Sequence, residues 1–127
     1  MKQVHIIHCY EAEVGDSGKK ELVNKIETRK IKQPLSLKEM QSIVEGSIEC
    51  YPASLPKMIS KLPDSRKITE MWINEEGRFT KPINHLATQI AYEIFGADKV
   101  TGRIPDTNQM VLSVHGTVFI NDNWRVS

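Results

Sequence analysis

Residues 68–96 constrain the fold of this chain most, because the spacing of their apolar residues changes partway along. Ile68–Asn74 is an apolar run typical of a strand, with Met71, Trp72 and Ile73 at its centre. After Pro82, apolar residues recur every three or four positions, the period of a helix. They are Ile83, Leu86, Ala87, Ile90, Ala91, Ile94 and Phe95. Gly96 is placed to cap that helix. A strand leading into a helix within one short segment predicts an α+β fold.

The link between this strand and helix contains Glu75, Glu76, Gly77 and Arg78. Its composition predicts a hairpin-type turn in which Gly77 supplies a positive φ. Phe79 then resumes an extended path as far as Pro82.

The first third of the chain predicts two strands. Val4–Cys9 is short and apolar, and Glu11–Lys20 is marked as a loop by two glycines. Glu21–Gln33 alternates apolar and polar residues and carries lysines, which favours a half-exposed edge strand.

A second helix is predicted from Ser36 onward. Ser36 and Glu39 have the spacing of a capping box, in which each side chain satisfies a free backbone N–H at the helix start. Apolar residues then follow at helical spacing, and Gly46 is placed to end the helix in a left-handed conformation. Ser47–Tyr51 predicts a short strand, and an irregular segment with Pro52, Pro56 and Pro63 follows.

The C-terminal third predicts a loop over Asp98–Asn108, a last strand over Met110–Ile120 interrupted by Gly116, and a tail over Asn121–Ser127. The strands are close in sequence and mostly joined by hairpins. We therefore expect a single domain over residues 1–127, with a mixed, mainly antiparallel sheet and two main helices on one face.

Composition narrows the classes of function. The chain has 127 residues and a net charge of +1, with acidic and basic residues interleaved. A duplex nucleic acid binder usually shows a basic excess on one face, so duplex nucleic acid is not an expected partner. No apolar run approaches the ~20 residues that span a bilayer, so no membrane association is expected. Two cysteines without a CxxC motif favour reduced thiols and a cytoplasmic location.

Catalytic motifs are not apparent in the sequence. A strand would place His5 and His8 on opposite faces, which is poor geometry for a metal ligand pair. The chain contains neither GxGxxG nor GxxxxGK[ST], and no His, Cys or Asp cluster has the spacing of a metal site. We therefore expect no enzyme activity, no cofactor and no metal.

A recognition surface is the alternative, and its candidates surround the strand–turn–helix junction. They are Trp72, Asn74, Phe79, Asn84 and Thr88. An aromatic ring there is suited to stacking on a nucleobase, and an asparagine to bonding a base edge or ribose hydroxyl. Two of these residues also have a structural explanation: Trp72 as a core residue, and Asn84 as the cap of its helix. Phe79 has the weakest structural explanation.

Arginines are the candidates for binding phosphate, because the guanidinium presents a forked pair of donors. They are Arg29, Arg78 and Arg103. Arg103 lies in a loop between Gly102 and Pro105, where folding has least need of it.

Three blocks of the sequence resemble a family of small phage proteins. The first is the helix Ser36–Gly46 followed by Ile48 and Glu49; the second is Asn74–Gly77 with Asn84, Ala87 and Thr88; the third is Val114–Ile120, with Gly116 and Thr117. Together they cover residues 36 to 120. Within this group, the length and motif order are similar to those of the anti-Thoeris sponge proteins (Thoeris anti-defence, first type).

That resemblance implies a protein that binds and holds a cyclic ADP-ribose-type signal without cleaving it. Bacterial Thoeris TIR-domain proteins make this signal, and its sequestration blocks the anti-phage defence. The resemblance further implies cyclic di- or trinucleotides as second ligands, and a homo-oligomer (dimer or hexamer) with pockets between protomers. It places the protein in the cytoplasm of an infected bacterial cell, encoded by a phage or prophage.

The pockets of this family use an aromatic residue, an asparagine and arginines. The positions here that correspond are Phe79 or Trp72, Asn84, and Arg103 with Arg29. We expect Phe79→Ala and Asn84→Ala to weaken ligand retention while leaving the midpoint of thermal unfolding near its original value. Two other functions stay open: an inhibitor that docks on a host enzyme through the edge strand Glu21–Gln33, and a cyclic-nucleotide phosphodiesterase.

Overall fold

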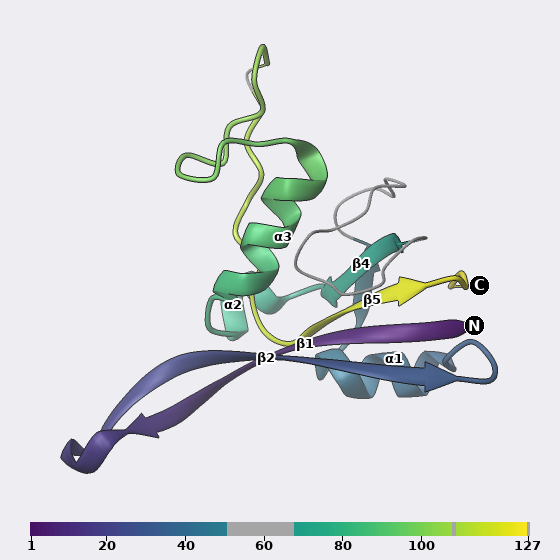
Figure 1. The fold of residues 1–127 in the computed structure, drawn as a ribbon, viewed down its shortest axis with the longest axis horizontal. Coiled ribbons are helices and arrows are strands. Elements are labelled where there is room, and N and C mark those ends of the chain that lie inside the picture. The colour runs from purple at the N-terminus through teal and green to yellow at the C-terminus, as the bar shows by residue number, and fades with distance from the viewer. Residues whose placement is uncertain (51–67, 108, 127) are drawn as a thin grey trace.

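The computed structural model describes residues 1–50, 68–107 and 109–126. Its elements, in chain order, are β1 (Lys2–Val14), η1 (Gly15–Ser17), β2 (Lys19–Ile31), α1 (Leu37–Val44), β3 (Ile48–Cys50), β4 (Ile68–Asn74), α2 (Gly77–Thr80), α3 (His85–Phe95) and β5 (Val118–Asp122). The strands form one five-stranded sheet in the order β2-β1-β5-β4-β3, and every neighbouring pair is antiparallel. The α+β class is as predicted (Figure 1). The irregular segment predicted around Pro52, Pro56 and Pro63 lies outside the described residues.

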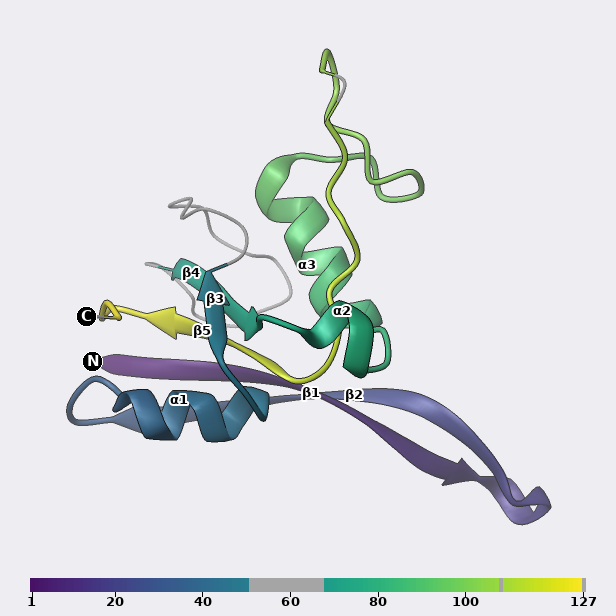
Figure 2. The same ribbon diagram turned by 180° about the vertical axis from the view of Figure 1, so that it is seen from behind.

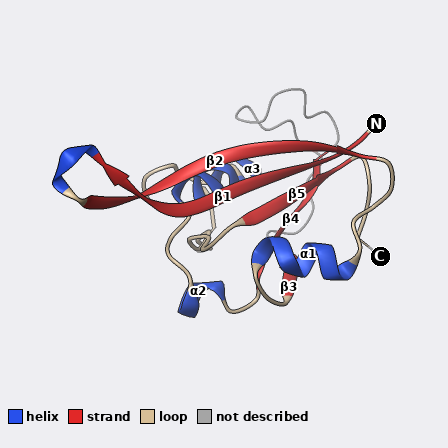
Figure 3. Cartoon of the chain, turned by 90° about the horizontal axis from the view of Figure 1, so that it is seen from below, coloured by secondary structure: helices blue, strands red, loops and turns tan. Residues whose placement is uncertain are grey.

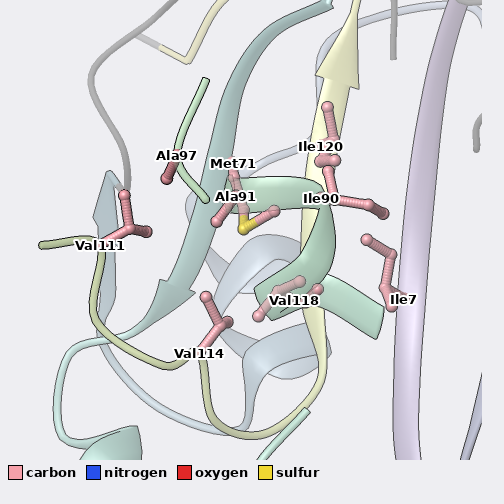
Figure 4. Packing of buried hydrophobic residues seen from close by; sticks show 10 residues of the cluster. Ile7, Met71, Ile90, Ala91, Ala97, Val111, Val114, Val118 and Ile120 are labelled. Atoms are coloured by element: carbon pink, nitrogen blue, oxygen red, sulfur yellow. The ribbon is translucent and has the colours of Figure 1, made fainter. Parts of the chain in front are cut away.

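The two main helices lie on opposite faces of this sheet, not on one face as expected. Successive strand residues point to opposite faces, and the core divides accordingly. Ile7, Met71 and Ile120 pack with Ala87 and Ile90 of α3 (Figure 4). Their neighbours along the strands, among them Ile6 and Phe119, pack with Met40 and Val44 of α1. The sheet is therefore a central layer with an apolar cluster on each side, and α3 and α1 lie on opposite sides of it (Figure 2).

Strands β1 and β2 are longer than the sequence predicted. Their ladder runs from Lys2–Ile31 to Val14–Lys19, and only residues 15–18 form the connection. The expected loop over Glu11–Lys20 is therefore wrong, because its polar residues belong to a hairpin that extends beyond the core and needs no apolar face. Strand β2 lies at the edge of the sheet, as predicted.

Helix α1 begins as predicted and ends differently. Ser36 and Glu39 form the reciprocal capping box. The left-handed residue at the end is Glu45, with φ of 60°, and not Gly46. A Cβ at Gly46 would lie 2.6 Å from Nδ2 of Asn74. A glycine is therefore needed at position 46 because the Asn74 side chain approaches closely, and not because the backbone there is left-handed.

The turn predicted at residues 75–78 is instead a short helix, α2, which includes Phe79. Gly77 does not have a positive φ. A Cβ there would lie 2.9 Å from the backbone oxygen of His115, so close packing explains the glycine. The predicted hairpin-type turn is therefore wrong, because α2 and α3 follow β4 before the chain re-enters the sheet as β5.

Helix α3 begins after the cap residue Asn84 and ends at Gly96, which is left-handed with φ of 65°, as predicted. The last strand is shorter and later than expected, because β5 begins at Val118 and runs to Asp122. The predicted tail is partly core: Trp124 is 5% exposed and stacks on Phe119. Among the described residues, no helix has the length and apolar character to cross a bilayer.

Candidate functional site

A pocket opens where β4 meets α2, beside the segment at residues 112–115. Its volume is about 220 Å³. Its lining residues are Glu49, Ile73, Asn74, Glu75, Arg78, Phe79, Leu112, Ser113 and His115. The close contact between Gly77 and the backbone of His115 holds α2 against this segment. The pocket therefore joins the end of the predicted strand to residues almost 40 positions later in the chain.

Phe79 and Arg78 project from α2 beside this pocket. The Phe79 side chain contributes little to folding, because the residue is 87% exposed. Arg78 is also exposed, and among the described residues the ion pairs of the structure do not include it. A free aromatic face next to a free guanidinium suits a ligand with both a planar ring and an anionic group.

His115 is held in one orientation on the pocket wall. Its Nδ1 lies 3.0 Å from the carbonyl oxygen of Lys81, and its Nε2 lies 2.8 Å from Oγ of Ser113. Because a carbonyl can only accept, Nδ1 carries the proton in the neutral ring. Nε2 then accepts the hydrogen of the Ser113 hydroxyl. In this state Ser113 offers only acceptor lone pairs to a ligand, which suits hydroxyl or amino donors.

Asn74 lies at this pocket but is occupied by the backbone. Its Nδ2 donates to the carbonyls of Val44 and Glu45, and its Oδ1 accepts from the N–H of Glu76. It thus satisfies carbonyls at the end of α1 and fixes the chain entering α2. The structural role explains this residue fully.

Asn84 is also a structural residue, which corrects the expectation that its removal would leave stability unchanged. It is 0% exposed. Its Oδ1 accepts from the N–H of Ala87 and from Nδ2 of Asn24, and its Nδ2 donates to the carbonyls of Ile7 and Gly116. Both donors are used within the protein, so a ligand could bond them only after displacing β1 or the segment before β5.

Thr88 and Trp72 face the core. Thr88 is 5% exposed, and its hydroxyl donates to the Asn84 carbonyl and accepts from the N–H of Val114. Trp72 stacks on Phe119 with ring centroids 6.5 Å apart, on the face covered by α1. Of the two aromatic candidates, only Phe79 is exposed at the pocket.

The two predicted phosphate ligands Arg29 and Arg103 do not line this pocket, and Arg29 lines a separate hollow with His8, Ile43 and Glu45. Arg29 belongs to β2 and forms an ion pair with Glu27. The Arg29 hydrogen bond, followed by that of His8, lowers the pKa of Glu27 to about 2. Arg103 is exposed in the segment after α3, which lies at the far end of that helix from β2 (Figure 1). The structure therefore brings together Asn74 and Phe79, but neither of these arginines.

The sequence did not predict Ser113 or His115 as site residues, and Arg78 was one of three arginine candidates without being assigned to a pocket. The available signal was the spacing of Ser113 and His115, since residues two apart in an extended segment share a face. Within the described ranges, no group of three or more His, Cys, Asp or Glu side chains has metal-site geometry.

The two thiols are not activated. Burial, and then the hydrogen bond to Glu70, raises the pKa of Cys50 to about 12, and burial also raises the pKa of Cys9. Neither is suited to act as a nucleophile at neutral pH.

Comparison of the chain with protein-family models, with curated proteins and with solved structures gives no match.

Proposed function

We propose that this protein binds and holds a cyclic ADP-ribose-type nucleotide without cleaving it, and so blocks Thoeris defence in the cytoplasm of an infected bacterial cell. The observation that carries the proposal is the exposed Phe79 beside Arg78 at the rim of the pocket. A nucleotide offers the matching chemistry: a base to stack, an anionic diphosphate, and ribose hydroxyls as donors to acceptors such as Ser113. The motif resemblance over residues 36 to 120 selects the cyclic ADP-ribose class.

The size of the pocket supports a binding site shared between chains. Small-molecule sites are usually about 300–1,000 Å³, and this pocket in a single chain has a volume of about 220 Å³. A nucleotide would therefore protrude from a single chain, and a second copy would cover the exposed part. Deep burial between two copies gives the retention that a sequestering protein needs. Cyclic di- or trinucleotides would occupy a separate site in such an assembly.

Calorimetric titration with the purified product of a TIR-domain enzyme tests this proposal. We expect Phe79→Ala and Arg78→Ala each to weaken binding at least tenfold. Thr80→Ala is the matched control, because Thr80 is an exposed α2 residue that does not line this pocket. Equal affinity of all four proteins, or no binding by the wild type, would contradict the proposal.

A second candidate function is hydrolysis of the bound nucleotide, and the pairing of Ser113 with His115 favours it. The hydroxyl lies 2.8 Å from a ring nitrogen able to take its proton, as in serine nucleophiles activated by histidine. The two functions differ in product. After incubation, removal of free ligand and heat denaturation, sequestration releases the intact nucleotide, whereas hydrolysis releases a cleaved product whose formation Ser113→Ala abolishes.

A further inference from the structure

The hairpin β1–β2 extends beyond the rest of the sheet as a two-stranded arm, residues 8–25 (Figure 3). Strand β5 pairs with β1 only from Gln3 to Ile7, so from His8 onward β1 has β2 as its single neighbour among the described strands. A two-stranded hairpin without further strands is marginally stable in water. The arm also exposes apolar side chains, with Tyr10 at 47% and Val14 at 44%.

We propose that the free edge of β2 pairs with β2 of a second copy of this chain, antiparallel across a twofold axis at Val23. Such an axis requires one residue to face its own copy, and in an antiparallel pair the residues on either side then face each other in reverse order. With Val23 at the axis, Lys19 faces Glu27 of the partner and Glu21 faces Lys25 of the partner, each twice by symmetry.

Charge selects this register over its neighbours. With the axis at Leu22, Lys19 would face Lys25 of the other copy; at Asn24, Glu21 would face Glu27; at Lys25, that lysine would face itself. Like charges directly opposite each other destabilise a strand pair. Axes at Ile26 and Thr28 avoid like charges, but each gives only one kind of opposite-charge pair instead of two. Lysines on a free edge usually deter pairing, whereas here the intervening glutamates give Lys19 and Lys25 a partner.

The same register brings Val23 of the two copies together beside the exposed Tyr10 of each arm. Tyr10 lies directly opposite Val23 in the β1–β2 ladder, so both side chains are on one face. Joining the two copies at Val23 makes a continuous row of Tyr10, Val23, Val23 and Tyr10 across four strands. This interface is at the opposite edge of the sheet from β3, whose Glu49 lines the nucleotide pocket. The proposed pairing is therefore independent of the proposed function.

Sedimentation equilibrium of the full chain, without nucleotide, tests the pairing through charge reversal. We expect the wild type to form a dimer, and Glu21→Lys or Lys25→Glu alone to weaken it at least tenfold, because each creates two like-charge pairs. The double variant Glu21→Lys with Lys25→Glu restores the opposite charges and should restore the dimer. All four proteins should give the same far-ultraviolet circular dichroism spectrum, since these side chains are exposed and their replacement leaves the fold of each chain intact.

Cross-linking tests the axis itself. In a background with Cys9→Ser and Cys50→Ser, Val23→Cys should cross-link to its own copy with a short bis-maleimide, because facing Cβ atoms in a strand pair lie about 4.5–5.5 Å apart. Lys30→Cys is the control and should not cross-link, because the axis places its two copies far apart. A monomeric wild type, single variants that dimerise as well as the wild type, an unrestored double variant, or absent cross-linking at position 23 would each overturn the proposal.

Discussion

The Asn84 side chain connects four parts of the molecule through a single buried amide. It caps α3, bonds Asn24 of β2, and holds the carbonyls of Ile7 and Gly116. Removing it leaves buried polar groups without partners, and each such group costs about 1–3 kcal/mol. The main role of Asn84 is therefore to stabilise the fold, and not to bind a ligand.

Asn84→Ala is expected to lower the free energy of unfolding by roughly 3 kcal/mol, from the lost cap and the unpaired carbonyls. Urea denaturation at pH 7 measures this change. The neighbouring variant His85→Ala serves as the control, because His85 is exposed. An unfolding midpoint for Asn84→Ala equal to that of the control would contradict the structural role.

Phe79, unlike Asn84, contributes little to the stability of the fold. With 87% of the residue exposed, Phe79→Ala removes little buried surface, so we expect a change of less than about 0.5 kcal/mol in the free energy of unfolding. Thermal unfolding followed by circular dichroism checks this. A loss comparable to that of a core residue would mean that Phe79 packs against the protein and is not available to a ligand.

The contribution of the Cys50 thiol to the free energy of unfolding is predicted to fall as the pH rises. Its pKa is raised from 9.0 to about 12 by burial and then by Glu70, so the fold favours the neutral thiol. That contribution to stability is complete below pH 9 and is lost as the pH rises from 9 toward 12. We expect slow alkylation of Cys50 in native protein at pH 9, and fast alkylation in urea, measured by peptide mass spectrometry. Equal rates in both states would contradict the raised pKa.

At the scale of elements, two glycines are explained by close packing. Gly77 lies against the backbone of His115, and Gly46 lies against the Asn74 side chain. The sequence predicted that both positions would be glycine-dependent, but assigned a positive φ to each. A glycine in a sequence marks a position where a Cβ is not tolerated, and only the tertiary structure distinguishes conformation from contact.

Gly77→Ala is expected to move α2 away from the segment at 112–115, because a Cβ would lie 2.9 Å from a backbone oxygen that cannot rotate away. We expect a loss of about 1–3 kcal/mol in the free energy of unfolding, together with weaker nucleotide binding. Gly15→Ala is the comparison, since it has a positive φ and no atom within 4 Å of a Cβ, and it should cost about 1 kcal/mol without affecting binding. Identical binding by the two variants would contradict the role of Gly77 at the pocket.

At the scale of the whole molecule, local signals predicted most elements. The capping box of α1, the bounds of β4 and the end of α3 at Gly96 follow from residues next to one another in the chain, and the structure confirms them. What could not be predicted depends on contacts between distant residues. Periodicity shows which stripe of a helix is apolar, but not which face of the sheet covers it, so the placement of α1 and α3 on opposite faces was missed.

The candidate site was predictable only where its residues are close together in the sequence. Asn74 and Phe79 were selected from the strand–turn–helix segment, and both line the pocket. Ser113 and His115 come from another part of the chain, and Arg29 and Arg103 lie elsewhere, because the positions of loops relative to one another are set by the fold. The tail was misread for the same reason, since Trp124 is buried by Phe119 and β1.

Whether this protein holds a nucleotide intact is the central question of its function. Mass spectrometry of the small molecules released by heat from protein purified after co-expression with an active TIR-domain enzyme measures this directly. We expect an intact cyclic ADP-ribose-type nucleotide from the wild type, and at least tenfold less from the Phe79→Ala variant at equal protein. Release of no such nucleotide, of a cleaved product, or of equal amounts from both proteins would contradict sequestration at the Phe79 pocket.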